Sequence, residues 1–238
     1  MASGWKLKRL HRQIILSQTY QQDSKFSEAA AQVDPENRLL WRRRPLRLEA
    51  EALRDAMLVC AGTLNREPFG PAFKPPIPAE AMVARNLKSP YNPEQPDSPN
   101  IRRRSVYMFH KRVVPYPLLQ TFDRPDALQS CSRRDATTVA PQALAILNDP
   151  FVRDRATEFA QRLQKECGGD LDSAVRGAFA ISLARSPSES ELKSSAEFIA
   201  ARQAQRQKRG MNEEDAQRAA LADFCQTMFG LNEFLYVD

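Results

Sequence analysis

The placement of proline constrains this chain more than any other feature of its sequence. Nine of the 17 prolines fall within residues 65–100, whereas the whole chain has only 8 glycines. Proline lacks a backbone N–H and fixes its own φ angle, so this stretch excludes long helices and central strands. The scarcity of glycine also leaves few sites for tight β-hairpin turns. The sequence therefore predicts helices on both sides of one long proline-rich connection.

Apolar residues recur at helical spacing on both sides of that connection. The clearest patterns cover residues 5–20, 47–64, 151–166, 171–183 and 188–209. Ser188 and Glu191 form a capping box, and Asn212 is typical of a helix N-cap. Asp34 followed by Pro35 indicates another helix start, and residues 104–111 have the composition of a short strand. We expect a mainly α, multi-helix domain with one short β element.

The whole chain is expected to form a single domain with four parts. These are N-terminal helices (1–64), the proline-rich connection (65–100), a motif-rich segment (101–149) and a C-terminal helical part (150–238). No apolar run approaches the roughly 18 residues needed to cross a bilayer. The basic N-terminal stretch lacks the continuous apolar run of a signal peptide.

Arginine supplies most of the positive charge, with 26 Arg against 9 Lys in a chain of formal charge +6. The planar guanidinium pairs well with carboxylates, and 29 acidic residues are present. This arginine-rich composition indicates either internal ion pairs or a face that binds an anionic ligand. The basic clusters are dispersed, and we find no zinc finger, basic zipper or RNP motif. We do not expect nucleic-acid binding.

The four cysteines are too widely spaced for a metal-binding motif. Cys60, Cys131, Cys167 and Cys225 include no CxxC pair and no CxxCH haem motif. The sequence therefore predicts neither a metal site nor a cofactor. Cys60 and Cys225 lie on apolar helix faces and are expected to be buried thiols.

The motif-rich segment supplies two candidate catalytic groups. Cys131 could act as a nucleophile, with His110 as its general base and nearby arginines favouring the thiolate. Asp123 and Asp126 could instead be the paired carboxylates of a glycoside hydrolase. Aspartates in such a sequence also commonly cap turns.

The same segment could form a pocket for a carboxylated or sulfated ligand. Arginine forks capture such groups, and aromatic faces suit sugars. The candidate ligand-binding residues are Arg103, Arg104, Tyr107, His110, Arg112, Arg133 and Arg134. The alternative is that these arginines pair internally with carboxylates and hold the proline-rich connection to the helices.

The chain contains the blocks LKRLHRQIILSQTYQQ, DPENRLLWRR, RLEAEALRDAML, RRRSVYMFHKRVVPYPLLQTFDRPD, LARSPSESEL and LNEFLYVD. Together these blocks resemble the planctomycete PSD-one family, the domain of unknown function 1553. The resemblance implies the C-terminal part of a large exported protein, behind a companion planctomycete domain and often a c-type cytochrome domain. Those upstream domains are absent from this chain, so we expect a truncated product, a fragment or an unusually split gene.

These observations predict a non-catalytic structural or interaction module of an exported, cell-envelope-associated protein, rather than an enzyme. The expected partners are upstream domains or proteins that carry the companion planctomycete domain. The alternative is a hydrolase or accessory ligand-binding domain that acts on an anionic, sulfated or carboxylated polysaccharide.

Overall fold

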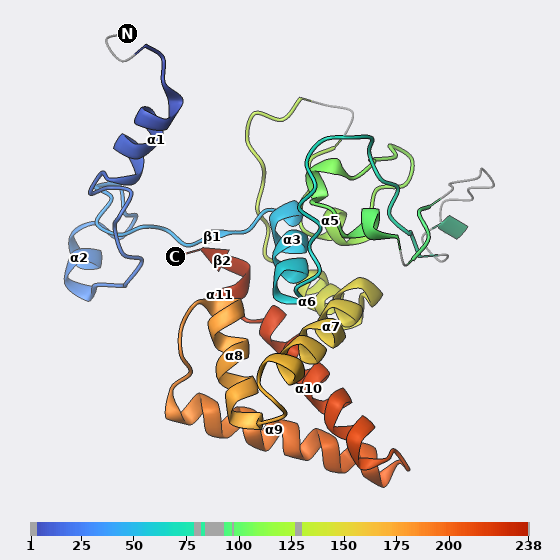
Figure 1. Cartoon of the computed structure of the whole chain (residues 1–238). Coiled ribbons are helices and arrows are strands. Elements are labelled where there is room, and N and C mark those ends of the chain that lie inside the picture. Colours follow the sequence, from blue (N-terminus) through green and yellow to red (C-terminus); the bar gives the residue numbers. More distant parts are fainter. Residues whose placement is uncertain (1–3, 79–81, 84–92, 97, 127–129, 238) are drawn as a thin grey trace. The chain divides into compact units, whose positions relative to one another are not determined.

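Helices make up most of this computed structural model, which describes residues 4–78, 82–83, 93–96, 98–126 and 130–237 (Figure 1). The α-helices are α1 (Leu7–Ile15), α2 (Glu28–Val33), α3 (Ala50–Cys60), α5 (Pro117–Thr121), α6 (Ala140–Asn148), α7 (Pro150–Glu166), α8 (Leu171–Leu183), α9 (Glu189–Lys208), α10 (Glu213–Phe229) and α11 (Asn232–Leu235). Two 3-10 turns, η1 (Pro99–Arg102) and η2 (Ser105–Tyr107), and two short strands, β1 (Leu46–Arg47) and β2 (Tyr236–Val237), complete the described elements. The mainly α prediction is confirmed. No described helix is both long and apolar enough to span a membrane.

The chain divides into two compact units, residues 1–47 with 236–238 and residues 48–235. In the first unit, β1 pairs antiparallel with β2, and Leu46 lies opposite Val237. None of the described hydrophobic side chains of this unit is fully buried. Hydrogen bonds and partly exposed ring contacts, such as Phe26 with Trp41 at a centroid distance of 5.9 Å, therefore carry much of its local order.

The helix predicted to start at Asp34 and Pro35 was wrong. Asn37 and Leu40 both have φ angles of 56°, in the left-handed region, which a right-handed helix does not allow. The Asp34 carboxylate accepts a hydrogen bond from the Leu39 N–H at 2.7 Å, and the Asn37 amide donates to the Arg42 carbonyl at 2.7 Å. These side chains close a turn, and the helix is the preceding α2, capped by Ser27.

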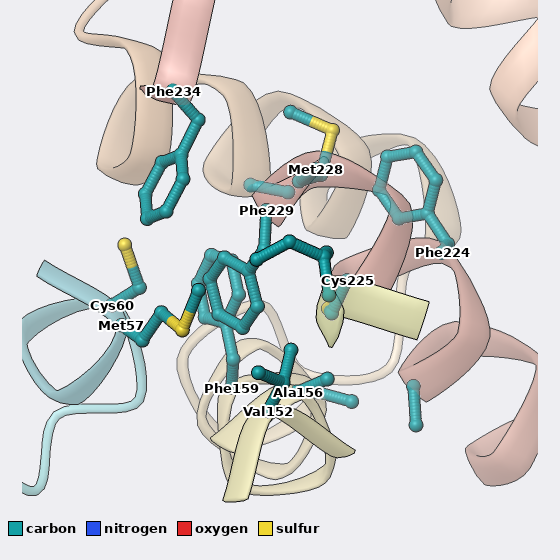
Figure 2. Packing of buried hydrophobic residues seen from close by; sticks show 14 of the residues in the cluster. Met57, Cys60, Val152, Ala156, Phe159, Phe224, Cys225, Met228, Phe229 and Phe234 are labelled. Carbon is teal, nitrogen blue, oxygen red and sulfur yellow. The ribbon is translucent and has the colours of Figure 1, made fainter. Parts of the chain in front are cut away.

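The apolar core of the second unit lies mainly between α7 and α10 (Figure 2). The Phe159 and Phe229 rings stack with centroids 6.0 Å apart, and Phe234 approaches Phe229 at 5.1 Å. The other core side chains labelled in Figure 2 are Met57, Cys60, Val152, Ala156, Phe224, Cys225 and Met228. Helices α3 and α11 thus contribute to a core that α7 and α10 dominate.

Side-chain caps begin the C-terminal helices where the sequence predicted them. Ser188 and Glu191 form the expected capping box of α9, and the Asn212 side chain accepts from the Asp215 N–H at the start of α10. Asp149 caps α7 by accepting from the Phe151 N–H at 2.8 Å. These helix starts are confirmed because capping is local in sequence.

The strand predicted at residues 104–111 was wrong. Ser105–Tyr107 forms the 3-10 turn η2, and among the described residues only Met108 makes a bridge there, with Phe73. The Phe73 N–H donates to the Tyr107 carbonyl at 3.0 Å, and the Phe109 N–H donates to the Phe73 carbonyl at 2.7 Å. The described start of the proline-rich connection therefore runs beside η2, with Phe73 buried.

Candidate functional site

A buried arginine of α3 fixes the backbone that follows η1. Arg54 is 2% exposed and donates from Nη1 to the Arg103 carbonyl at 3.1 Å and to Ser105 Oγ at 3.2 Å. Its Nη2 donates to the Ile101 carbonyl. Asp55 Oδ1 accepts from the Ser105 N–H at 2.8 Å. Because the Ser105 N–H already donates to Asp55, it is not free to donate to a neighbouring strand.

Burial also lowers the pKa of Arg54, while Tyr116 and Asp55 act in the opposite direction. Arginine's pKa is normally so high that a lowered value still leaves it protonated. The buried cation faces carbonyl oxygens and aromatic rings, including Phe151 at 4.9 Å from its guanidinium carbon. Arg54 therefore holds the η1–η2 backbone on α3 as a charged, multiply bonded centre.

Arg102, the last residue of η1, extends to a carboxylate on α7. Glu158 Oε1 accepts from Arg102 Nη2 at 2.8 Å and from Arg155 Nη2 at 2.8 Å. Glu158 Oε2 accepts from Thr63 Oγ1 at 2.9 Å. This half-buried carboxylate links three separate segments, so it fixes the position of Arg102 above α7.

A second arginine of α7 supports the loop after α3. Arg162 Nη1 donates to the carbonyls of Val59 and Cys60 at 3.1 and 3.0 Å, and its Nε donates to Glu166 at 2.8 Å. Gly62 turns the loop with a φ of +72°, and a Cβ there would lie 3.1 Å from Arg162 Cδ. Glycine thus provides both the left-handed turn and the space for this arginine.

These contacts shape an open groove of about 870 Å³ between the α3 loop and α7, which we call the basic groove. Its lining residues are Val59, Ala61, Gly62, Thr63, Leu64, Arg66, Arg102, Glu158, Gln161, Arg162, Lys165 and Glu166. Four cationic side chains face two carboxylates, and both carboxylates are already paired with arginine. Arg66 and Lys165 are exposed and form no hydrogen bond or ion pair with other described residues. The groove therefore has two cationic side chains, Arg66 and Lys165, that are unpaired with other described residues, beside the paired side chains of Arg102 and Arg162.

The predicted ligand-binding residues Arg103, Arg104 and Arg112 differ in burial and in contacts. Arg103 is buried, donates to the carbonyls of Pro71 and Phe69, and lies 4.3 Å from the ring centroid of Tyr107. Arg104 and Arg112 are exposed. Arg103 and Tyr107 therefore hold the loop at residues 69–71.

Glu51 interacts with two other predicted ligand-binding residues, Arg134 through an ion pair and His110 through its charge. Arg134 Nη1 lies 2.6 Å from Glu51 and 3.3 Å from Glu49. Burial and the charge of Arg124 lower the pKa of His110, while Glu51 partly offsets them. Neutral histidine is therefore favoured, and its buried Nδ1 has no hydrogen-bond partner among the described residues.

The candidate catalytic residues Cys131, Asp123 and Asp126 line an open depression of about 480 Å³, together with Arg133 and Arg134. Cys131 Sγ donates to the Arg133 carbonyl at 3.0 Å, and Asp123 accepts from the Thr137 N–H at 2.7 Å. His110 is not among the described residues that line the depression. Cys131, Asp123 and Asp126 thus line one depression, and His110 does not line it within the described part of the chain.

The four cysteines are free thiols, and Cys60 and Cys225 are buried, as predicted. Burial raises the pKa of Cys60 to about 12, which strongly disfavours its thiolate. Within the described ranges, no three His, Cys, Asp or Glu side chains form a group that could hold a metal ion.

Sequence reasoning missed the basic groove. Arg66 and Lys165 belong to segments nearly 100 positions apart, and neither residue lies in a recognisable motif. The one local signal was Gly62 near the end of the helical pattern at residues 47–64, which indicates a helix end but identifies no partner.

Comparison with known proteins places the chain in a family without giving it an activity. The model of PSD1, described as "Protein of unknown function (DUF1553)", matches residues 1–199. No curated protein and no solved structure matches the chain. Because the matched residues cover most of the chain, as the sequence blocks predicted, this protein belongs to the PSD1 (DUF1553) family.

Proposed function

We propose that this chain is a non-catalytic interaction module whose basic groove binds anionic groups, such as the sulfates or carboxylates of a polysaccharide. The observation that carries the proposal is the pair of uncommitted cations, Arg66 and Lys165, beside the fixed cations Arg102 and Arg162. An anion placed there would face cationic donors without displacing an existing ion pair. The open shape suits one segment of a long chain better than a fully enclosed small molecule.

The internal contacts of the other arginines support a binding role over catalysis. Arg54, Arg103 and Arg134 are all engaged with backbone carbonyls or carboxylates. Asp123 is likewise occupied by Thr137, so it serves a loop contact. These groups hold the irregular segments in place, and the groove lies on the frame that they stabilise.

The test is a binding titration of the full chain with sulfated, carboxylated and neutral oligosaccharides of equal length. We expect the charged ligands alone to bind and to raise the melting temperature. The variant Arg66→Ala with Lys165→Ala should lose this binding and keep its unliganded stability, because both side chains are exposed and unpaired with other described groups.

The matched control is Arg104→Ala with Arg112→Ala, which removes the same charge from two residues of the sequence-predicted site. Both side chains are exposed, so this variant should also fold normally. Retained binding in the control would assign the ligand to the basic groove. Loss in the control and retention in the groove variant would reject the groove.

A hydrolase remains the second candidate, because Asp123, Asp126 and Cys131 line one depression. It predicts turnover of chromogenic glycosides of sulfated sugars or uronic acids. Asp123→Asn and Asp126→Asn should each abolish such turnover, because two carboxylates carry glycoside hydrolysis. Turnover that survives both substitutions would exclude these groups as its source.

We also propose that the module works in an exported, cell-envelope-associated protein beside the companion planctomycete domain. The sequence blocks shared with the family support this location and this partner. Co-purification of the chain with a separately expressed companion domain tests the partnership, and failure to associate would count against it.

A further inference from the structure

The net positive charge of the chain lies entirely in its first 47 residues. Residues 1–47 contain ten Lys or Arg and four Asp or Glu, an excess of six. Residues 48–238 contain 25 of each, so they have no net formal charge. The entire excess of +6 therefore belongs to the first 47 residues, which form most of the first compact unit.

Within that unit, α1 separates its apolar and basic side chains onto different faces. At 100° per residue, Leu7, Leu10 and Ile14 share one side, and they are 67%, 51% and 47% exposed. Lys8, Arg9 and Arg12 occupy the flank and the opposite side. The helix buries none of its residues, so in this unit its apolar side is exposed to solvent.

The exposed apolar surface continues beyond both ends of α1. Trp5 precedes the helix and is 79% exposed, while Tyr20 follows it at 47%. The first acidic residue of the chain is Asp23, so no carboxylate side chain lies near in sequence to offset the basic face. An apolar face of this extent, bordered by cations, is typical of an interaction surface.

We propose that α1 binds the surface of an anionic lipid membrane, with its apolar side among the lipids and its basic residues at the head groups. Charge complementarity favours this partner, because the unit combines its excess of six positive charges with an uncovered apolar helix face. Tryptophan suits the boundary between head groups and acyl chains. A nucleic acid would satisfy the cations but leave Leu7, Leu10 and Ile14 exposed. This inference is independent of the basic groove, whose residues belong to the second unit.

Vesicle flotation of the full chain tests the proposal. We expect binding to equimolar phosphatidylcholine and phosphatidylglycerol, much weaker binding to phosphatidylcholine alone, and a decrease with added salt. Arg9→Gln with Arg12→Gln should weaken binding about 30-fold, because each basic residue near an anionic surface contributes about fivefold. Leu10→Asp with Ile14→Asp should weaken it by more than about tenfold, because the apolar side no longer enters the lipid.

Matched controls come from exposed residues of the second unit. Leu144→Asp with Leu147→Asp makes a similar apolar-to-acidic change on α6, where both leucines are exposed, and Arg104→Gln with Arg112→Gln removes the same charge. Both controls should bind vesicles more strongly than the corresponding α1 variants. Circular dichroism should give all four variants the wild-type helix content.

Three outcomes would overturn the proposal. Equal binding to charged and neutral vesicles would remove the role of the basic face, and unchanged binding of the Leu10→Asp, Ile14→Asp variant would remove the role of the apolar face. Self-association that this variant abolishes, without any vesicle binding, would assign the face to a second copy of the chain instead.

Discussion

The α7–α10 core and the η1–η2 segment belong to the same compact unit but are stabilised by opposite kinds of contact. The core is packed from aromatic and aliphatic side chains, with Phe159 and Phe229 fully buried. The η1–η2 segment is held by hydrogen bonds from Arg54 to backbone carbonyls. The hydrophobic effect that stabilises the core is not directional, whereas these hydrogen bonds require particular donors at particular positions.

This difference predicts which substitutions destabilise each region. A core side chain is replaceable by another apolar side chain of similar volume at a moderate cost in stability, because the new side chain still fills the space between its neighbours. Arg54 has no equivalent substitute, because its guanidinium serves two carbonyls and a hydroxyl at once. Substitutions that separate volume from hydrogen bonding therefore distinguish the two regions.

The largest effect is expected in the apolar core. Phe159→Ala should lower the free energy of unfolding by about 4 kcal/mol, because it removes a fully buried ring and leaves a cavity. Phe159→Leu should cost much less, since it retains most of the volume. Chemical denaturation with both variants measures the difference. Equal costs would mean that this core does not depend on filled volume.

A somewhat smaller effect is expected for the arginine centre. Arg54→Leu should lower the free energy of unfolding by about 3 kcal/mol, because several buried acceptors lose their donor. Hydrogen exchange should increase at Ser105 and its neighbours, whose backbone Arg54 and Asp55 hold in place. If Arg54→Leu is neutral and exchange is unchanged, the η1–η2 segment is held by something other than this arginine.

The same contrast explains what the sequence could predict. Helix α8 was predicted at its observed bounds, and the caps Ser188 and Asn212 were found, because periodicity and capping involve residues close in sequence. The strand at 104–111 was wrong, because Asp55, 50 positions earlier, accepts from the Ser105 N–H, and Ser105–Tyr107 forms a 3-10 turn. The basic groove depends on contacts between residues even farther apart in the sequence, from 56 positions for Arg102 and Glu158 to 103 positions for Arg162 and Val59.

The smallest effect on stability is expected for an ion pair near the surface. It joins Arg185, in the loop after α8, to Glu191 in the first turn of α9. Arg185 donates to both oxygens of Glu191, at 2.9 and 2.7 Å, and also to Glu233. The Arg185 hydrogen bonds, followed by those of Ser188, lower the pKa of Glu191 to about 2 from an ordinary 4.5. A carboxylate with a lowered pKa stabilises the fold above its unfolded pKa, and this contribution disappears as the pH falls towards its folded pKa.

We therefore expect Glu191→Gln to reduce stability by less than about 1 kcal/mol at neutral pH, because solvent screens this exposed pair. The difference from wild type should shrink as the pH falls from 4.5 and should be nearly absent near pH 2. Glu189→Gln, in the same first turn of α9, is the control, because Glu189 is not part of the Arg185 contact. Urea denaturation across this pH range measures both variants. A pH-independent difference for Glu191→Gln would show that its effect comes from the neutral part of the capping box, and that this contact, unlike the Arg54 centre, does not depend on charge.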